Sequence, residues 1–167
     1  MKGADGRYLR EYQALGTAGG LYLFRDAILK GDPKTIIVMH SDVCCSFPLE
    51  DMLKMHIEQE AIGTMLGTKV SLQPSWLINK ISPEAACNYG CIVSDPETHE
   101  VLHYVEKPSS YISSTINCGV YLFDTSLFAF IREVMNKVCE TCDSTDCRGN
   151  RIKQILQVDM WIHTGMR

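Results

Sequence analysis

The stretch Thr35-Ile36-Ile37-Val38-Met39, followed directly by His40-Ser41-Asp42-Val43, decides the fold class of this chain. The residues from Thr35 to Met39 are β-branched or apolar throughout, which is typical of a strand whose sheet is covered by helices on both faces. Asp42 follows at the carboxyl end of that strand, the edge where open α/β sheets bind their ligands. We therefore predict an α/β domain with a ligand site just after Thr35–Met39.

A helix is predicted before this strand, because apolar residues recur at helical spacing from Leu21 to Leu29. The helix should end at Gly31, and Pro33 follows, since glycine accepts a left-handed backbone and proline cannot continue the helix. The glycines of residues 16–20 place a tight turn at its beginning. We predict a short strand, Tyr8–Tyr12, in front of that turn.

A second helix is predicted to start near Pro48, with Glu50 and Asp51 in its first turn. The side expected to face the core carries three apolar residues, Met52, Leu53 and Ile57. The strand Met65–Val70 comes next. This alternation of helices and strands predicts a largely parallel sheet.

Three further strand-like runs, with only turn residues between them, are Tyr89–Val93, Val101–Glu106 and Ile116–Phe123. A last amphipathic helix is predicted from Leu127 to Val138, with Asp124 or Thr125 as its cap. The segment of residues 71–87 contains Pro74, Trp76 and Pro83. We predict that it is an irregular insertion.

The composition excludes several classes of protein. The 167 residues are 46% hydrophobic and 22% charged, which provides enough apolar material for one domain with a core. A net charge of -4 gives no basic footprint for nucleic acid and argues weakly against a membrane surface. No apolar run has the length of a membrane span, and no secretion signal is seen at the N-terminus, so a cytoplasmic location is expected.

The chain has eight cysteines, and most of them lie in or beside apolar runs, where a free thiol behaves as a small hydrophobe. Cys139, Cys142 and Cys147 instead cluster in polar sequence. This cluster has two interpretations: a zinc site with His163 as the fourth ligand, or a reduced linker. The spacing differs from that of the common zinc fingers, which favours the linker.

Five short motifs follow one another along the chain. They are Leu15-Gly16-Thr17-Ala18-Gly19-Gly20, His40-Ser41-Asp42-Val43, Asn88-Tyr89-Gly90, Val105-Glu106-Lys107-Pro108 and Ile116-Asn117-Cys118-Gly119-Val120-Tyr121. Together they resemble the motifs of the sugar-nucleotide pyrophosphorylases, and they are most similar to those of the α-type GDP-mannose pyrophosphorylases. The resemblance runs from about Tyr8 to Phe130.

The resemblance implies a Rossmann-like, mixed, mostly parallel sheet of the nucleotide-diphospho-sugar transferase type. It also implies synthesis of GDP-mannose from GTP and mannose 1-phosphate, with Mg²⁺ as cofactor. Two alternatives remain open. One is a non-catalytic, GDP-mannose-binding regulatory subunit that forms a hetero-oligomer with a catalytic β-type paralogue, and the other is a truncated, inactive product.

Asp42 is the residue that the resemblance assigns to Mg²⁺ and to catalysis. Mg²⁺ accepts one or two carboxylates together with waters and phosphate oxygens, and Asp42 follows a buried strand. From the residues alone, Asp42 is equally suited to capping the turn toward Pro48. The resemblance favours the metal.

The resemblance assigns the nucleobase to Leu15, Gly16 and Thr17. From the residues alone, a helix that merely begins with a tight turn is the favoured explanation of this glycine cluster. An exposed helix N-terminus also suits an anion.

The remaining site residues are assigned to the sugar phosphate. Lys107 would place a positive charge at the phosphate and take part in catalysis, and Glu106 would bind sugar hydroxyls, although a solvated strand end explains both residues. Asn117 and Gly119 share one face of their strand. By resemblance, Asn117 bonds a hydroxyl, Gly119 leaves room for the sugar, and Asn88 and Gly90 act in the same site.

The chain departs from the complete family pattern. Relatives begin with a loop of the type Gly-x-Gly-Thr-Arg-x-x-Pro-Leu that cradles the triphosphate, and nothing in Met1–Arg7 matches it. Losing oriented charge around a phosphoryl group costs orders of magnitude in rate, so weak or absent catalysis is expected. We thus expect a chain truncated at both ends, with a partial nucleotidyltransferase domain at residues 1–138 and a poorly defined, Cys-containing tail at 139–167.

Overall fold

The computed structural model describes residues 6, 8–12, 16–41, 46–70, 87–141 and 160–163. The chain forms two compact units. One unit comprises residues 1–33 and 128–155, and the other comprises residues 34–127 and 156–167. None of the helices in the described segments is both long and apolar enough to cross a membrane.

The first unit contains α1 (Gly16–Leu23), α2 (Arg25–Ile28) and almost all of α5 (Leu127–Thr141). The predicted first helix is therefore interrupted at Phe24, and the chain turns at Gly31, which has a φ of 97°. The predicted strand Tyr8–Tyr12 is wrong, because this segment has no regular secondary structure and its side chains are exposed.

Asp124, one of the two residues predicted to cap α5, stabilises the turn before this helix. The backbone N–H of Ser126 donates to Asp124 Oδ1 at 2.7 Å, in the turn just before the helix. Hydrogen bonds from the side chain and the backbone of Ser126 lower the pKa of the Asp124 carboxyl. Leu127 and Ile131 are buried, as their helical spacing predicts.

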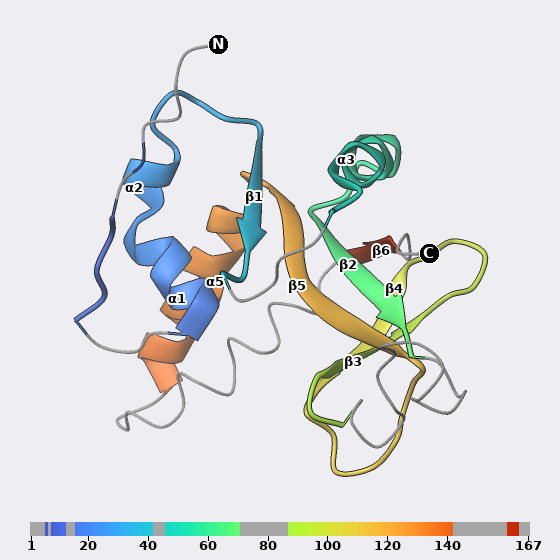
Figure 1. Ribbon diagram of the computed structural model, residues 1–167. Coiled ribbons are helices and arrows are strands. Elements are labelled where there is room, and N and C mark those ends of the chain that lie inside the picture. Colours follow the sequence, from blue (N-terminus) through green and yellow to red (C-terminus); the bar gives the residue numbers. More distant parts are fainter. Residues whose placement is uncertain are drawn as a thin grey trace. The chain divides into compact units, whose positions relative to one another are not determined.

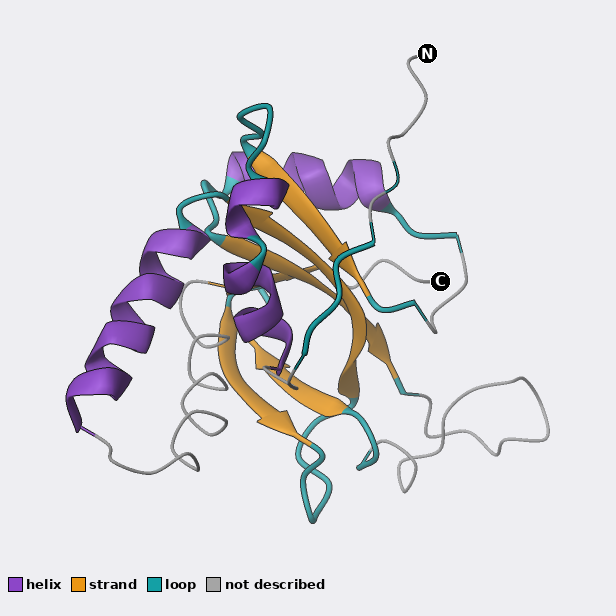
Figure 2. Ribbon diagram, turned by 90° about the vertical axis from the view of Figure 1, so that its left-hand side faces the viewer, coloured by secondary structure: helices purple, strands orange, loops and turns teal. Residues whose placement is uncertain are grey.

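The second unit is built on a six-stranded sheet with β5 (Thr115–Asp124) at its centre (Figures 1 and 2). The strand order is β4-β3-β5-β2-β6, and β1 also pairs with β5. The other strands are β1 (Thr35–Met39), β2 (Gly63–Lys69), β3 (Gly90–Ser94), β4 (Val101–Glu106) and β6 (Met160–His163).

The sheet differs from the mostly parallel one predicted. Among the pairings of the described strands, β2 with β6 is parallel, whereas β1, β2 and β3 all pair antiparallel with β5, and β3 pairs antiparallel with β4. Because β1 and β2 both run opposite to β5, they run in the same direction, as a strand-helix-strand unit should. The prediction failed because β5 lies between them (Figure 1).

One edge of β5 is shared by two strands. β1 pairs along residues 120–124 of β5, and β3 pairs with Thr115 and Ile116. Between these pairings the chain bulges: Met65 of β2 faces Tyr121, but Gly67 faces Asn117. Gly119 lies in this bulge with a φ of 71°, a backbone conformation that glycine adopts most easily.

Helix α3 (Leu49–Glu58) packs on one face of this sheet. Met52 is fully buried and forms a core cluster with Leu66, Val120 and Leu122. The side of α3 predicted to be buried is only partly correct, because Leu53 is 40% and Ile57 is 64% exposed.

His56 is buried in place of those two residues. Its ring nitrogen Nδ1 lies 2.9 Å from the hydroxyl of the buried Thr64. A hydrogen-bonded polar residue therefore occupies the core-facing position one helical turn after Met52.

Candidate functional site

Four of the predicted sugar-binding residues lie on the face of the sheet opposite α3. Glu106 stands directly across from Gly90 in the β3–β4 pair, and Ile92 stands across from Thr115 in the β3–β5 pair. Since side chains alternate along a strand and paired residues share a face, Asn117 lies on the same face as Gly90 and Glu106. Gly119 follows in the bulge of β5, and the face carrying Val120 and Leu122 points the other way, toward α3.

A hydrogen-bonded network joins Glu106, Asn117 and Gly119 with two tyrosines, Tyr104 and Tyr121. Tyr104 donates from its hydroxyl to Glu106 Oε2 at 2.5 Å. The Asn117 side chain donates from Nδ2 to the hydroxyls of both Tyr104, at 3.2 Å, and Tyr121, at 2.7 Å. Asn117 Oδ1 accepts the backbone N–H of Gly119 at 2.9 Å, so one amide ties β4 to the bulge of β5.

Both phenols stay protonated at neutral pH. Burial raises the pKa of Tyr104, and the hydrogen bond to the Glu106 carboxylate raises it further. Burial likewise raises the pKa of Tyr121, partly offset by the hydrogen bond from Asn117. Tyr104 therefore acts as a donor to Glu106 while it accepts from Asn117.

Neither tyrosine was assigned a role from the sequence, although Tyr121 ends one of the five motifs. Alternation along each strand indicates only that Tyr104 shares a face with Glu106, two residues on, and Tyr121 with Asn117, four residues before it.

The two glycines of the site make room for side chains of this chain. A methyl group on Gly119 would lie 2.7 Å from Nδ1 of His40, and one on Gly90 would overlap the hydroxyl of Tyr104. The His40 ring also meets Tyr121 edge to face, with ring centroids 5.9 Å apart. His40 itself continues the pairing of β1, since its N–H donates to the Gly119 carbonyl at 2.9 Å.

Asn88 and Lys107 lie at the same end of the β3–β4 hairpin as Glu106. Asn88 is an exposed turn residue before β3, and Lys107 is exposed directly after β4. The Lys107 N–H donates to the carbonyl of Tyr89 at 3.3 Å. Lys107 has a φ of 46°, a sparsely populated conformation for a residue with a side chain.

The other predicted site residues are described only in part. Asp42 and Leu15 lie outside the described residues, and so does most of the predicted insertion at 71–87. Gly16 and Thr17 open α1 in the first unit. In the cysteine cluster, Cys139 belongs to α5, whereas Cys142 and Cys147 lie outside the described residues.

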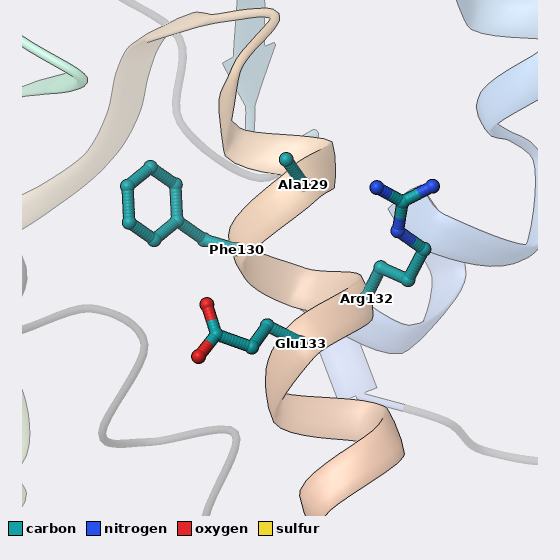
Figure 3. A pocket seen from close by; sticks show the side chains of 4 residues that line it. All are labelled: Ala129, Phe130, Arg132 and Glu133. Carbon is teal, nitrogen blue, oxygen red and sulfur yellow. The ribbon is translucent and has the colours of Figure 1, made fainter.

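No metal-binding group is present in the described segments: nowhere in them do three or more His, Cys, Asp or Glu side chains converge. A pocket of about 360 Å³ lies along α5 of the first unit. Its lining side chains, shown in Figure 3, include none of the predicted site residues; they are Ala129, Phe130, Arg132 and Glu133.

Comparisons with known proteins identify the family. The model of the family described as "Nucleotidyl transferase" matches residues 3–165. A probable mannose-1-phosphate guanyltransferase of Schizosaccharomyces pombe is 51% identical over 80% of this chain and 30% of its own length. The human mannose-1-phosphate guanylyltransferase regulatory subunit alpha is 48% identical over 78% of this chain and 29% of its own length.

A third relative, regulatory subunit alpha-B of Danio rerio, is 40% identical over 96% of this chain and 36% of its own length. The chain thus spans about a third of the length of these curated relatives. The matches to regulatory and guanylyltransferase proteins agree with the subfamily that the motifs resemble.

A solved structure has the same fold. It comes from Bacillus anthracis, is described as a glucose-1-phosphate thymidylyltransferase in complex with a sucrose, and is 18% identical. The match has a TM-score of 0.62 and covers 90% of this chain and 53% of the other. The predicted α/β fold of the nucleotide-diphospho-sugar transferase type is thereby confirmed, and the chain belongs to the nucleotidyl transferase family.

Proposed function

We propose that this chain forms the sugar-binding part of an α-type GDP-mannose pyrophosphorylase, a cytoplasmic protein that binds GTP and mannose 1-phosphate or their product GDP-mannose. The observation that carries the proposal is a hydrogen-bonded network that includes Glu106, Asn117 and Gly119, together with Gly90, which leaves room for the Tyr104 phenol of that network. Apart from Tyr104, these residues come from three of the motifs that resemble the family, and chance matches have no reason to converge in space.

The network suits the recognition of a sugar. The Glu106 carboxylate is exposed at the end of β4, and ionised carboxylates form strong hydrogen bonds with hydroxyl groups. Lys107 follows it directly and adds a positive charge for the phosphate on the sugar. The site thus has a group for each part of a hexose 1-phosphate.

Synthesis of GDP-mannose would join a phosphate oxygen of mannose 1-phosphate to the α-phosphorus of GTP, with release of pyrophosphate. Nucleotidyl transfer generally uses a divalent metal ion, which neutralises charge on the phosphates. By family resemblance the ion is Mg²⁺ and its protein ligand is Asp42, a carboxylate of the kind that Mg²⁺ accepts. Leu15, Gly16 and Thr17 are the proposed contacts of the guanine base.

The second candidate function is regulation. The similar human and zebrafish proteins are both named as regulatory subunits, which favours a GDP-mannose-binding role beside a catalytic β-type paralogue in a hetero-oligomer. In that role the same site binds GDP-mannose but carries out little turnover.

Binding by two variants tests the site, and a rate measurement separates the two functions. Asp42→Ala should abolish Mg²⁺-dependent binding of GDP-mannose, and Lys107→Ala should abolish phosphate-dependent binding. The exposed Lys54, on α3, provides the control Lys54→Ala. Unchanged affinity in both site variants would refute the assignment of these residues.

Release of pyrophosphate from GTP and mannose 1-phosphate is then measured with the chain alone and with a catalytic β-type subunit. Turnover by the chain alone supports the enzyme. Saturable binding without turnover, together with a changed rate of the β-type subunit, supports the regulatory role.

A further inference from the structure

The Asn117 side chain has few hydrogen-bonding positions left for a ligand. A side-chain amide has two N–H donors, and those of Asn117 go to the hydroxyls of Tyr104 and Tyr121. Its oxygen already accepts one hydrogen bond, from the N–H of Gly119. Both donors of Asn117 are therefore used within the protein, and Oδ1 keeps one acceptor position for a sugar hydroxyl.

The Glu106 carboxylate has a charged oxygen that can accept a hydrogen bond from a ligand. Tyr104 holds Oε2, which leaves Oε1 as an acceptor on an exposed carboxylate. An unrestrained glutamate at a strand end samples many rotamers, and fixing one costs conformational entropy on binding. A hydrogen bond from a half-buried phenol removes part of that cost before the ligand arrives.

Tyr104 is itself held from two sides. Asn117 donates to its hydroxyl, and the absence of a side chain at Gly90 leaves the space that the phenol occupies. The phenol can thus keep one position over β3, with its proton directed at Glu106.

We propose that Tyr104 is a positioning residue that fixes the Glu106 carboxylate for vicinal hydroxyls of a hexose, and that Asn117 orients Tyr104. This inference rests on the proposed function, because it assumes that Glu106 meets the sugar of a nucleoside diphosphate sugar. It assigns sugar selectivity to a residue outside the five motif cores.

The test compares two ligands by calorimetry on the purified chain with Mg²⁺. The ratio of the Kd for GDP to the Kd for GDP-mannose measures the contribution of the sugar. Losing a hydrogen bond to a charged group typically weakens binding about tenfold or more. Tyr104→Phe should therefore lower the ratio about tenfold. The Kd for GDP should stay unchanged. Tyr111→Phe, at an exposed tyrosine of the same unit, is the matched control.

A double-mutant cycle shows whether Tyr104 acts through Glu106. Glu106→Ala should remove the sugar contribution, and adding Tyr104→Phe to Glu106→Ala should change nothing further. An additional loss in the double variant would contradict the proposal, because it would mean that Tyr104 acts independently.

A proton resonance distinguishes the loss of this one hydrogen bond from a general loss of structure. The phenol proton in the short Tyr104–Glu106 hydrogen bond should give a downfield ¹H resonance that persists in Tyr111→Phe and disappears in both Tyr104→Phe and Glu106→Ala. A resonance that survives Tyr104→Phe would contradict the network.

The outcomes separate the inference from the proposed function. A wild-type ratio near one contradicts the proposed function and, with it, the role of Tyr104. A wild-type preference for GDP-mannose that persists in a folded Tyr104→Phe variant contradicts the inference alone.

Discussion

The Asn117 amide donates a 2.7 Å hydrogen bond to the hydroxyl of Tyr121, four residues further along the same strand. In a regular strand, residues four apart are separated by about 13 Å. The bulge between them shortens this span, since β5 has three residues, Cys118, Gly119 and Val120, opposite the single residue Leu66. The candidate sugar site therefore depends on an irregularity of the central strand.

Replacing Gly119 by alanine should destabilise the second unit by about 3 kcal/mol, because it combines a left-handed backbone with a steric clash. The added methyl would lie 2.7 Å from His40 Nδ1. Gly31→Ala, in the first unit, shows the cost of a left-handed backbone without a clash, because Gly31 has a φ of 97° but nothing within 4 Å of an added methyl. Urea denaturation should show a clearly smaller loss for Gly31→Ala, and equal losses would rule out the clash.

Asn117→Ala should lower the free energy of unfolding by about 2 kcal/mol, because it leaves the Gly119 N–H without its acceptor and removes the donor to Tyr104 and Tyr121. The change should also weaken sugar binding through Tyr104. Asn88→Ala, at an exposed turn, is the comparison for stability. Similar unfolding midpoints for the two variants would speak against the network.

Met52→Ala should cost about 2–5 kcal/mol, the usual range for truncating a buried methionine, because it opens a cavity against Leu66, Val120 and Leu122. Leu53→Ala on the same helix should cost much less, since Leu53 is 40% exposed. Chemical denaturation of both variants checks which side of α3 is buried. A larger loss for Leu53→Ala would reverse the assignment.

The stability of the second unit should fall as the pH drops below about 6.5. Burial lowers the pKa of His56 in the folded state, an effect that the nearby Asp124 carboxylate partly offsets. The unfolded chain, with a His pKa near 6.5, then binds the proton more readily than the folded chain, so the contribution of neutral His56 is present at higher pH and lost as the pH falls.

Urea midpoints measured from about pH 7.5 to about pH 5.5 test this dependence. His56→Gln keeps a polar side chain beside Thr64 and should flatten the profile, whereas His103→Gln, at an exposed position of β4, should not. A His56→Gln profile as steep as that of the wild type would show that another group titrates.

Much of the fold could be predicted from local sequence. The strands β1 and β4 have the predicted bounds, and the turns at Gly31 and at Asp124 lie where the sequence places the ends of helices. These features depend on neighbouring residues alone. The antiparallel pairing of the strands could not be predicted in this way, because β5 pairs between β1 and β2, which are distant from it in sequence.

In the site, too, the residues could be predicted from the sequence but their contacts could not. The motifs identified Gly90, Glu106, Asn117 and Gly119, but they did not reveal what each residue contacts. Tyr104 fills the space over Gly90, and His40 fills the space beside Gly119. Such contacts form across strands, and no spacing along one strand indicates them.

The central claim is that this chain carries a site for a guanine nucleotide sugar, and calorimetric titration of the folded chain with GDP-mannose in the presence of Mg²⁺ tests it most directly. UDP-glucose serves as the control ligand. The account predicts saturable binding of GDP-mannose and none of UDP-glucose. No heat with either ligand, from a chain shown to be folded, would contradict it.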